Sequence, residues 1–403
     1  MTSPKITVII PTRERASVLG AALRTVTAQT YENLEIIVSD NNSGDGTDAV
    51  VQHANDSRIR YLNTGKRLSM SHNWEFALTH VREGWVTFMG DDDGLLPGAI
   101  HRMAEIIVET KAQVIRTEYC TYDWPGMLGR PYGQLIVPLT SGMESRNSRK
   151  WLKKALEGHV RYSQLPMIYN GGFIHFSVLQ HIRDVMGVFF SSVNPDVYTA
   201  VAIARLTDDF LFVREPLAIS GTSKYSNGHS AFSARASRNP QAYRQFLSEG
   251  NIPSHADMPT SKEGNMPTSL QACVYEAYLQ SARLGGSVDS MNHARQLAVV
   301  LATSGKHRTA IDAWGQDFSH LHGLDYSRAN RSAVHLRRKL ESRWLGQKLV
   351  RVLRSVVTDR LALQNVYEAS IAAGALRAAP GRMDSLRFLG NELRGAWRAR
   401  INA

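Results

Sequence analysis

The stretch "ITVIIPTRERASVLGAALRTVTAQTYENLEIIVSD", residues 6–40, decides the fold class. Residues 6–11 form a short apolar run rich in β-branched side chains, which is typical of a buried strand. Residues 16–30 have the apolar period of a helix, and residues 33–40 repeat the strand pattern. A strand, a helix and a second strand in this order predict one unit of a parallel sheet.

The same alternation continues through the first third of the chain. We expect further strands at 59–63, 85–89 and 112–117, with helices at 48–55, 70–81 and 97–111. This pattern predicts an α/β protein with a mostly parallel, doubly wound sheet. Ligands of such sheets bind at the carboxyl ends of the strands.

Acidic residues follow two of the expected strands. Asp40 ends the strand at 33–40, and Asp91, Asp92 and Asp93 follow the strand at 85–89. Three adjacent carboxylates repel one another, so a cation such as Mg²⁺ or Mn²⁺, held together with a diphosphate, would make the cluster tolerable. The alternative interpretation is an acidic turn that caps the helix beginning near Pro97. Asp40 is placed to accept hydrogen bonds from a base or ribose, although it could equally be a turn aspartate.

These motifs together resemble the opening of glycosyltransferase family 2. The matching features are the strand ending in Pro-Thr, the second strand ending in Asp, and the block "NTGKRLSMSHNWEFALTHVREGWVTFMGDDD" that runs into the aspartates, residues 63–93. The resemblance is strong over residues 5–120 and weaker over 120–230. It implies a GT-A fold, which is Rossmann-like, and an inverting transfer of sugar from a nucleoside diphosphate sugar, with a UDP-sugar favoured.

The resemblance also implies roles for individual residues at the donor site. Asp40 would bind the base, and Asn73 matches the family's helix asparagine. Asp93 would ligate the metal directly and Asp91 would face ribose or a metal-bound water, but Gly90 makes the register ambiguous, so Asp92 could take either role. Pro11, Thr12, Arg13 and Arg15 would line the nucleotide site, with Glu14 close by.

An inverting enzyme needs a general base to deprotonate the acceptor hydroxyl. Asp196 opens an apolar helical run 103 residues after Asp93 and is the expected base. Its alternative role is that of a helix N-terminal acid favoured by the helix dipole. The pair Asp208–Asp209 is a rival, but it is better explained as the turn before a returning strand at 210–213.

The acceptor side is expected to involve four residues. Gly171 and Gly172 would permit close backbone approach. Lys224 lies in the small-residue loop 219–230, which could close over the diphosphate, and Trp124 could stack on a sugar or simply pack in its loop. His229, in the same loop as Lys224, is a candidate third metal ligand or a solvated loop residue.

The distribution of charge separates a nearly neutral body from a basic tail. The net charge is +11. About +9 of it falls in residues 317–403, which leaves about +2 for the rest and argues against nucleic-acid binding. We expect a catalytic domain over 1–250 with a nucleotide-sugar half (1–120) and an acceptor half (121–250), a linker at 251–269, and a basic, mostly helical region at 270–403.

The helical pattern at 336–357 combines apolar faces with many Arg and Lys residues. Such a helix could lie on an anionic membrane, pack on the catalytic domain or form an oligomer contact. Two cysteines, Cys120 and Cys273, and an N-terminus without a signal-peptide pattern predict a cytoplasmic protein, peripheral to the inner face of the plasma membrane if the helices bind lipid.

Three functions are compatible with these features. The first is a metal-dependent glycosyltransferase acting on a saccharide or lipid-linked acceptor, in surface polysaccharide or glycolipid synthesis. The second is a nucleotidyltransferase, although "PTRERAS" (11–17) lacks the glycines of a phosphate loop. The third is a non-catalytic nucleotide-sugar-binding or scaffold protein. The sequence leaves open the sugar, the base, the acceptor and the choice between Mg²⁺ and Mn²⁺.

Overall fold

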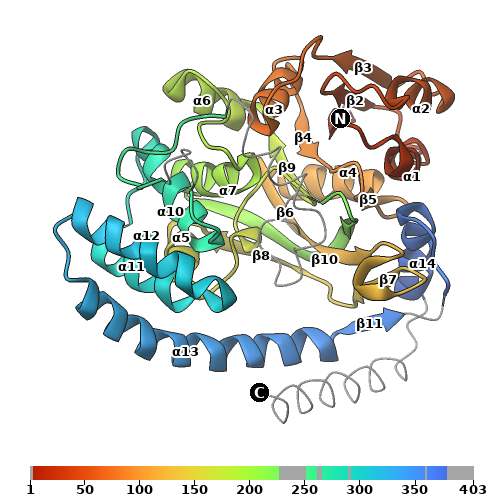
Figure 1. Ribbon diagram of the computed structural model, residues 1–403. Coiled ribbons are helices and arrows are strands. Elements are labelled where there is room, and N and C mark those ends of the chain that lie inside the picture. Colours follow the sequence, from red (N-terminus) through yellow and green to blue (C-terminus); the bar gives the residue numbers. More distant parts are fainter. Residues whose placement is uncertain (1–2, 227–250, 261–265, 289–291, 359–360, 379–403) are drawn as a thin grey trace.

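The computed structural model describes residues 3–226, 251–260, 266–288, 292–358 and 361–378. These residues form one mixed sheet with helices on both faces (Figure 1). The first four strands are parallel and lie in the order β3-β2-β1-β4. Their bounds are β1 Ile6–Thr12, β2 Leu34–Asp40, β3 Ile59–Asn63 and β4 Trp85–Phe88.

Alternation along β1 explains how helices come to cover both faces of the sheet. Ile6, Val8 and Ile10 belong to one hydrophobic core and Ile9 belongs to the other, because successive side chains of a strand point to opposite faces. The core with Ile6 includes α1 (Ala16–Thr27), α2 (Thr47–His53), α4 (Ala99–Thr110) and α14 (Val366–Ala378). The core with Ile9 includes α3 (Met70–Leu78), α5 (Ser148–Leu156), α6 (Phe176–Met186) and α7 (Pro195–Leu206).

The second half of the sheet is mixed, which the sequence pattern did not predict. β9 (Gly172–His175) is antiparallel to both of its neighbours, β4 and β6 (Val114–Asp123). β10 (Asp209–Thr222) pairs in parallel with β6, so the strand expected at 210–213 continues through the first four residues of the predicted loop 219–230. Antiparallel neighbours of β10 or β6 are β5 (Gly94–Leu95), β7 (Gln134–Pro138) and β8 (Met143–Asn147). Asp208 lies between α7 and β10, as predicted, and Asp209 is the first residue of β10.

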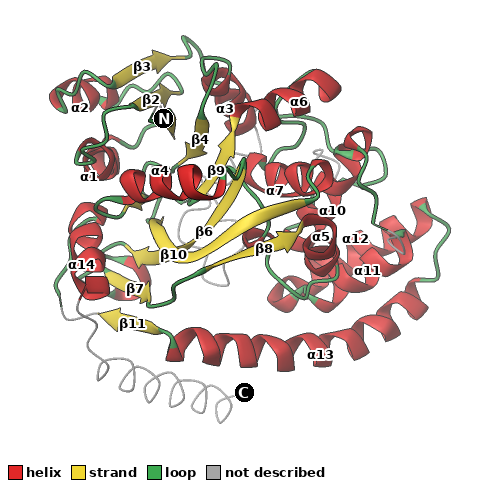
Figure 2. Cartoon of the chain, turned by 180° about the vertical axis from the view of Figure 1, so that it is seen from behind, coloured by secondary structure: helices red, strands yellow, loops and turns green. Residues whose placement is uncertain are grey.

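The C-terminal region is mostly helical, as predicted, but it also completes the sheet. Its helices are α10 (Leu270–Gln280), α11 (His293–Ala302), α12 (Arg308–Leu321) and α13 (Tyr326–Leu353). The chain then returns to the body, where β11 (Ser355–Thr358) pairs antiparallel with β7 (Figure 2). In α14, the Ser370 hydroxyl donates to the Leu95 carbonyl, two residues beyond the aspartate cluster. The helical region is therefore packed into the body that carries the expected site.

The described part of the segment 251–269 packs against α12. Met258 is buried, and Trp314 Nε1 donates to the Pro259 carbonyl at 2.8 Å. The division of the chain at this segment stays a prediction. No helix within the described residues is long and apolar enough to cross a membrane.

Candidate active site at the ends of the parallel strands

Asp91 ties the turn after β4 to the end of β1. Its two carboxylate oxygens accept hydrogen bonds from Thr12 Oγ1 and from Arg15 Nη1, both at 2.8 Å. Arg15 also donates to the Tyr225 carbonyl just beyond β10. Burial raises the pKa of Asp91, and the positive charge of Arg15 opposes that shift. Asp91 therefore organises the site and has both of its oxygens occupied.

Asp93 is held by three donors from three parts of the chain. Oδ1 accepts from the Gly221 amide at 2.6 Å, and Oδ2 accepts from the Gly90 amide at 2.8 Å and the Tyr169 hydroxyl at 2.5 Å. The side chain is buried. Burial, followed by the negative charge of Asp92, raises the pKa of Asp93 to about 7 despite these donors. A cation beside the turn would favour the ionised form.

Asp92 differs from Asp91 and Asp93 in the hydrogen bonds that its two carboxylate oxygens accept. Oδ2 accepts from Ser223 and Ser226 at 2.6 and 2.5 Å, and the backbone carbonyl accepts from Trp124 Nε1 at 2.9 Å. Oδ1 accepts no hydrogen bond within the described part of the chain. The sequence leaves open which of the three aspartates would ligate a metal directly, and in the structure the hydrogen bonds of Asp92 differ from those of Asp91 and Asp93.

The donor set suits a hard divalent cation. Asp91, Asp92 and Asp93 are all buried, and their oxygens are the ligand type that Mg²⁺ and Mn²⁺ prefer. No group of three or more His, Cys, Asp or Glu side chains within the described ranges is arranged to hold a metal without other ligands. His229, the predicted third ligand, lies outside these ranges. An ion here would share one or two carboxylates with substrate phosphates, which is how Mg²⁺ usually binds.

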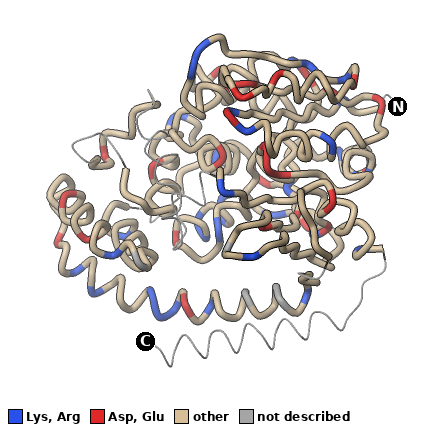
Figure 3. Tube along the Cα trace, turned by 45° about the vertical axis from the view of Figure 1, so that its right-hand side comes forward, with Lys and Arg blue, Asp and Glu red and all other residues tan. Residues whose placement is uncertain are grey.

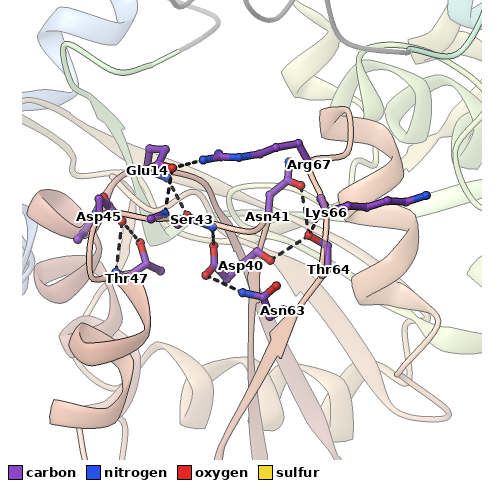
Figure 4. Close-up of polar contacts among 12 residues, drawn as sticks. Glu14, Asp40, Asn41, Ser43, Asp45, Thr47, Asn63, Thr64, Lys66 and Arg67 are labelled. Atoms are coloured by element: carbon purple, nitrogen blue, oxygen red, sulfur yellow. Dashed lines mark hydrogen bonds and ion pairs between the residues drawn. The ribbon is translucent and has the colours of Figure 1, made fainter.

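Asp40 lies at the same edge of the sheet and is buried, with 1% of its surface exposed. Oδ1 accepts from the Ser43 amide at 3.0 Å, and Oδ2 accepts from Asn63 Nδ2 at 3.3 Å (Figure 4). Oδ2 also accepts from the Tyr61 hydroxyl at 2.6 Å. Burial and the hydrogen bond to Asp40 raise the pKa of Tyr61 to about 12, so this phenol stays a donor at neutral pH. The sequence reasoning missed Tyr61 and Asn63, which belong to β3.

Glu14 joins the loops that follow three parallel strands. Its carboxylate accepts from the Gly44 amide at 3.0 Å and forms an ion pair with Arg67, and its own amide donates to the Ser43 hydroxyl at 2.8 Å (Figure 4). Its φ of 51° is in the left-handed region, which a non-glycine residue adopts only at some cost. The loops beside Asp40 are thereby fixed relative to one another.

The remaining predicted nucleotide-site residues lie close to this edge. Pro11 and Thr12 end β1, and Arg13 follows directly. Asn73 is buried in α3, where Oδ1 accepts from the Ser39 hydroxyl at 2.7 Å and Nδ2 donates to the Ser39 carbonyl at 3.3 Å. The structure thus shows Asn73 attaching α3 to β2, next to Asp40.

Asp196 is the second residue of α7 and is held by a tyrosine. The Tyr162 hydroxyl donates to Asp196 Oδ2 at 2.6 Å. Burial raises the pKa of Asp196, and the hydrogen bond from Tyr162 opposes this shift. Burial is the largest cause that raises the pKa of Tyr169, and the negative charges of Asp93, Asp92 and Asp196 raise it further. Tyr169 therefore senses both Asp196 and the aspartate turn.

Gly171 and Gly172, the two glycines predicted near the acceptor, allow other segments of the protein to pack closely against the backbone. Gly171 has a φ of +93°, and a Cβ on it would lie 2.5 Å from Thr117 Oγ1. A Cβ on Gly172 would lie 1.5 Å from the Met167 carbonyl oxygen. Both positions therefore require glycine for the chain to pass between β6 and the segment that carries Tyr169.

Trp124 and Lys224, the other two residues predicted for the acceptor side, differ in exposure. Trp124 is 9% exposed and holds the Asp92 carbonyl, so loop packing, the alternative given above, is what the structure shows. Lys224 is exposed, with Nζ 4.8 Å from the centroid of the Tyr225 ring. A sugar would find little of the Trp124 ring to stack on.

A half-open pocket of about 570 Å³ adjoins the first turn of α3. Its lining combines residues of α3, the segment leading to α7 and the segment 252–256. The polar and aromatic members include His72, Glu75, Phe190, Ser191, His255 and Gln280.

The buried carboxylates lie beyond the ends of parallel strands, where open α/β sheets bind their ligands. Residues 7–178 match the sequence model "Glycosyl transferase family 2". The resemblance to this family that the sequence indicated is thus confirmed over residues 7–178, and the predicted α/β fold with a helical C-terminal region is confirmed.

Curated relatives align with about a third of the chain. The GalNAc(5)-diNAcBac-PP-undecaprenol beta-1,3-glucosyltransferase of Campylobacter jejuni is 36% identical over 132 residues, which are 32% of this chain and 42% of that protein. Glycosyltransferase GlyA of Streptococcus pneumoniae is 30% identical over 124 residues, 30% of this chain and 17% of that protein. The chain therefore spans less than half the length of these two relatives.

Similar solved structures cover more of the chain at low identity. S. aureus TarS 1-349 in complex with UDP-GlcNAc is 15% identical with a TM-score of 0.43, covering 85% of this chain and 92% of TarS 1-349. The mannosyltransferase PcManGT from Pyrobaculum calidifontis, in complex with GDP-Man and Mn²⁺, is 16% identical with a TM-score of 0.39, covering 86% of this chain and 89% of PcManGT.

Proposed function

We propose that this chain is an inverting, divalent-metal-dependent glycosyltransferase. It would move a sugar from a nucleoside diphosphate sugar, with a UDP-sugar favoured, to a saccharide or lipid-linked acceptor. The observation that carries the proposal is the aspartate turn, in which both oxygens of Asp91 and of Asp93 accept hydrogen bonds while Asp92 Oδ1 accepts none from the described residues.

The donor would lie along the edge formed by the ends of β2, β1 and β4. Asp40, with Tyr61 and Asn63, would hold the base and ribose end. Asp92 Oδ1 is our preferred direct metal ligand, with Asp93 beside it, which revises the order of preference drawn from the sequence. A bound Mg²⁺ or Mn²⁺ would stabilise the negative charge that develops on the leaving diphosphate.

Asp196 would act as the general base. It would take the proton of the acceptor hydroxyl while that oxygen forms a bond to the anomeric carbon and the bond to the diphosphate breaks. Attack opposite the leaving group inverts the anomeric configuration. The raised pKa of Asp196 favours proton uptake, and Tyr162 would hold the carboxylate in place.

The acceptor is proposed to be a saccharide on a lipid carrier. The support is the printed name of the Campylobacter relative, whose acceptor is linked to undecaprenol through a diphosphate. The pocket beside α3 offers hydroxyl, imidazole, carboxylate and aromatic groups, which suit a saccharide. Such an enzyme would work in surface polysaccharide or glycolipid synthesis at the cytoplasmic face of a membrane.

Nucleotide release in the presence of Mn²⁺ tests this function. We would incubate the purified chain with UDP-glucose, UDP-GlcNAc or GDP-mannose and measure nucleoside diphosphate and pyrophosphate separately. Slow metal-dependent release of a nucleoside diphosphate, reduced at least about a hundredfold by Asp196→Asn without loss of nucleotide binding, is expected. Pyrophosphate release would instead indicate a nucleotidyltransferase, and binding without turnover of any donor would favour the non-catalytic alternative.

A further inference from the structure

The second half of α13 is largely exposed, and one side-chain hydrogen bond, from Gln347 Nε2 to the His159 carbonyl at 3.4 Å, joins it to the body. The helix has 28 residues and runs from the C-terminal helices to β11 (Figures 1 and 2). Its first half packs on the body through Ala329, Ala333 and Leu340, each at most 7% exposed. Beyond Leu340, every described side chain up to Arg354 is exposed. A helical segment as short as residues 341–354 is marginal in water when few of its side chains pack on anything, so contact with another surface would stabilise it.

An apolar stripe runs along the exposed half of the helix. Leu345, Leu349 and Leu353 recur every four residues and are 64%, 46% and 55% exposed. At about 100° per residue, Leu349 lies roughly opposite Leu340, the residue that faces the core. The stripe therefore points away from the protein.

Cationic side chains accompany this stripe. Arg338, Lys339, Arg343 and Arg354 are exposed, and basic residues recur along α13 in Figure 3. None of these four forms an ion pair with another residue of the described ranges, whereas Arg337 lies 3.9 Å from Glu341. At about 100° per residue, Arg338 and Lys339 lie beside the stripe. Exposed cations beside an exposed apolar stripe complement an anionic lipid surface, which presents negative headgroups above an apolar layer.

We propose that residues 341–354 of α13, with the preceding basic turn, dock on an anionic membrane surface. The leucine stripe would enter the boundary between headgroups and acyl chains, and Arg338 and Lys339 would contact the headgroups. This surface is separate from the nucleotide site, so the proposal stands independently of the catalytic one. If both hold, docking would bring the enzyme to the layer that carries a lipid-linked acceptor.

Vesicle co-sedimentation of the full chain tests the proposal. The probes are vesicles of phosphatidylcholine alone and of equal parts phosphatidylcholine and phosphatidylglycerol. One variant combines Leu345→Gln, Leu349→Gln and Leu353→Gln, and a second combines Arg338→Gln and Lys339→Gln. The matched control combines Val108→Gln, Leu321→Gln and Ile371→Gln, which replace apolar residues of similar exposure on other helices.

We expect the wild type to bind the anionic vesicles and to lose affinity as salt increases. The leucine variant should bind at least about tenfold more weakly, and the Arg338/Lys339 variant about fivefold more weakly per residue replaced. The control should bind like the wild type, and all variants should keep wild-type nucleotide affinity. The proposal is wrong if the wild type ignores anionic vesicles or if the leucine variant binds them equally well. It is also wrong if light scattering shows a dimer that the leucine substitutions dissociate while vesicle binding is absent.

Discussion

The Tyr169 hydroxyl lies 2.5 Å from Oδ2 of Asp93, and this bond joins the aspartate turn to the antiparallel half of the sheet. Tyr169 also forms a β-bridge with Phe88, the last residue of β4, and its ring lies 5.5 Å from that of Trp74. The geometry of the turn therefore depends on a segment that lies 76 residues further along the chain.

Metal-free protein should lose stability as pH rises toward 7. The pKa of Asp93 is raised to about 7 in the folded state, against 3.8 for its ordinary value. Between these values the folded state holds a proton that the unfolded state lacks, so this carboxyl's stabilisation falls with increasing pH, by at most about 1.4 kcal/mol per pH unit. Urea unfolding at several pH values measures the slope.

The Asp93→Asn variant and added Mn²⁺ are the controls for that slope. The variant lacks the titrating group, so its unfolding free energy should change less over the same range of pH. Bound Mn²⁺ favours the ionised carboxylate, so it should stabilise the wild type more at pH 7.5 than at pH 5. Equal slopes for wild type and variant would contradict the role given to Asp93.

Tyr162→Phe should shift the pH dependence of catalysis. The hydrogen bond from Tyr162 lowers the pKa of Asp196, so its loss should raise that pKa further. A base must be deprotonated to act, and the acidic limb of the kcat profile should therefore move to higher pH. Nucleotide affinity should not change. An unshifted profile would indicate that Asp196 is not the base.

Arg15 and Asp91 should behave as a coupled pair in unfolding experiments. Arg15→Met leaves the buried Asp91 carboxylate without its cation, and we expect a loss of about 3 kcal/mol or more. The double variant Arg15→Met/Asp91→Asn removes the stranded charge and should recover part of that loss. Additive losses from the two single variants would argue against the pairing.

Gly221→Ala should disrupt the aspartate turn. A Cβ there would lie 1.8 Å from the Asp92 carbonyl oxygen, and the Gly221 amide donates to Asp93. We expect loss of metal-dependent nucleotide binding, measured by calorimetry on protein that remains folded by circular dichroism. The matched control is Gly20→Ala in α1, where the nearest heavy atom would be 3.5 Å away, and it should stabilise the protein by about 0.5–1 kcal/mol.

The parallel half of the fold could be predicted because its signals are local. Strands at 6–11, 33–40, 59–63 and 85–89 show as apolar runs, and helix periods lie between them. The antiparallel strands could not be predicted in the same way. β9 has only four residues, and β11 joins the sheet through pairing with β7, more than 200 residues away in the chain.

The residues of the candidate site also fall into two groups, those with a local sequence signal and those without one. Asp40 and the aspartate triplet are visible because each follows a strand, whereas Tyr61, Tyr162 and Tyr169 carry no motif and become relevant only through tertiary contacts. Ser223 and Ser226 lie in the small-residue loop that was singled out in the sequence, but their bonds to Asp92 follow from the path of β10. Whether His229 joins them stays a prediction.

The most direct test of the central claim is calorimetric titration with UDP, GDP and dTDP, with and without Mn²⁺. The proteins would be the wild type, Asp92→Asn and the Gly20→Ala control. We predict that one nucleotide binds tightly only when Mn²⁺ is present, that Asp92→Asn abolishes this gain, and that the control matches the wild type. Binding of no nucleotide, or binding that is indifferent both to Mn²⁺ and to Asp92, would contradict the proposed metal–diphosphate site.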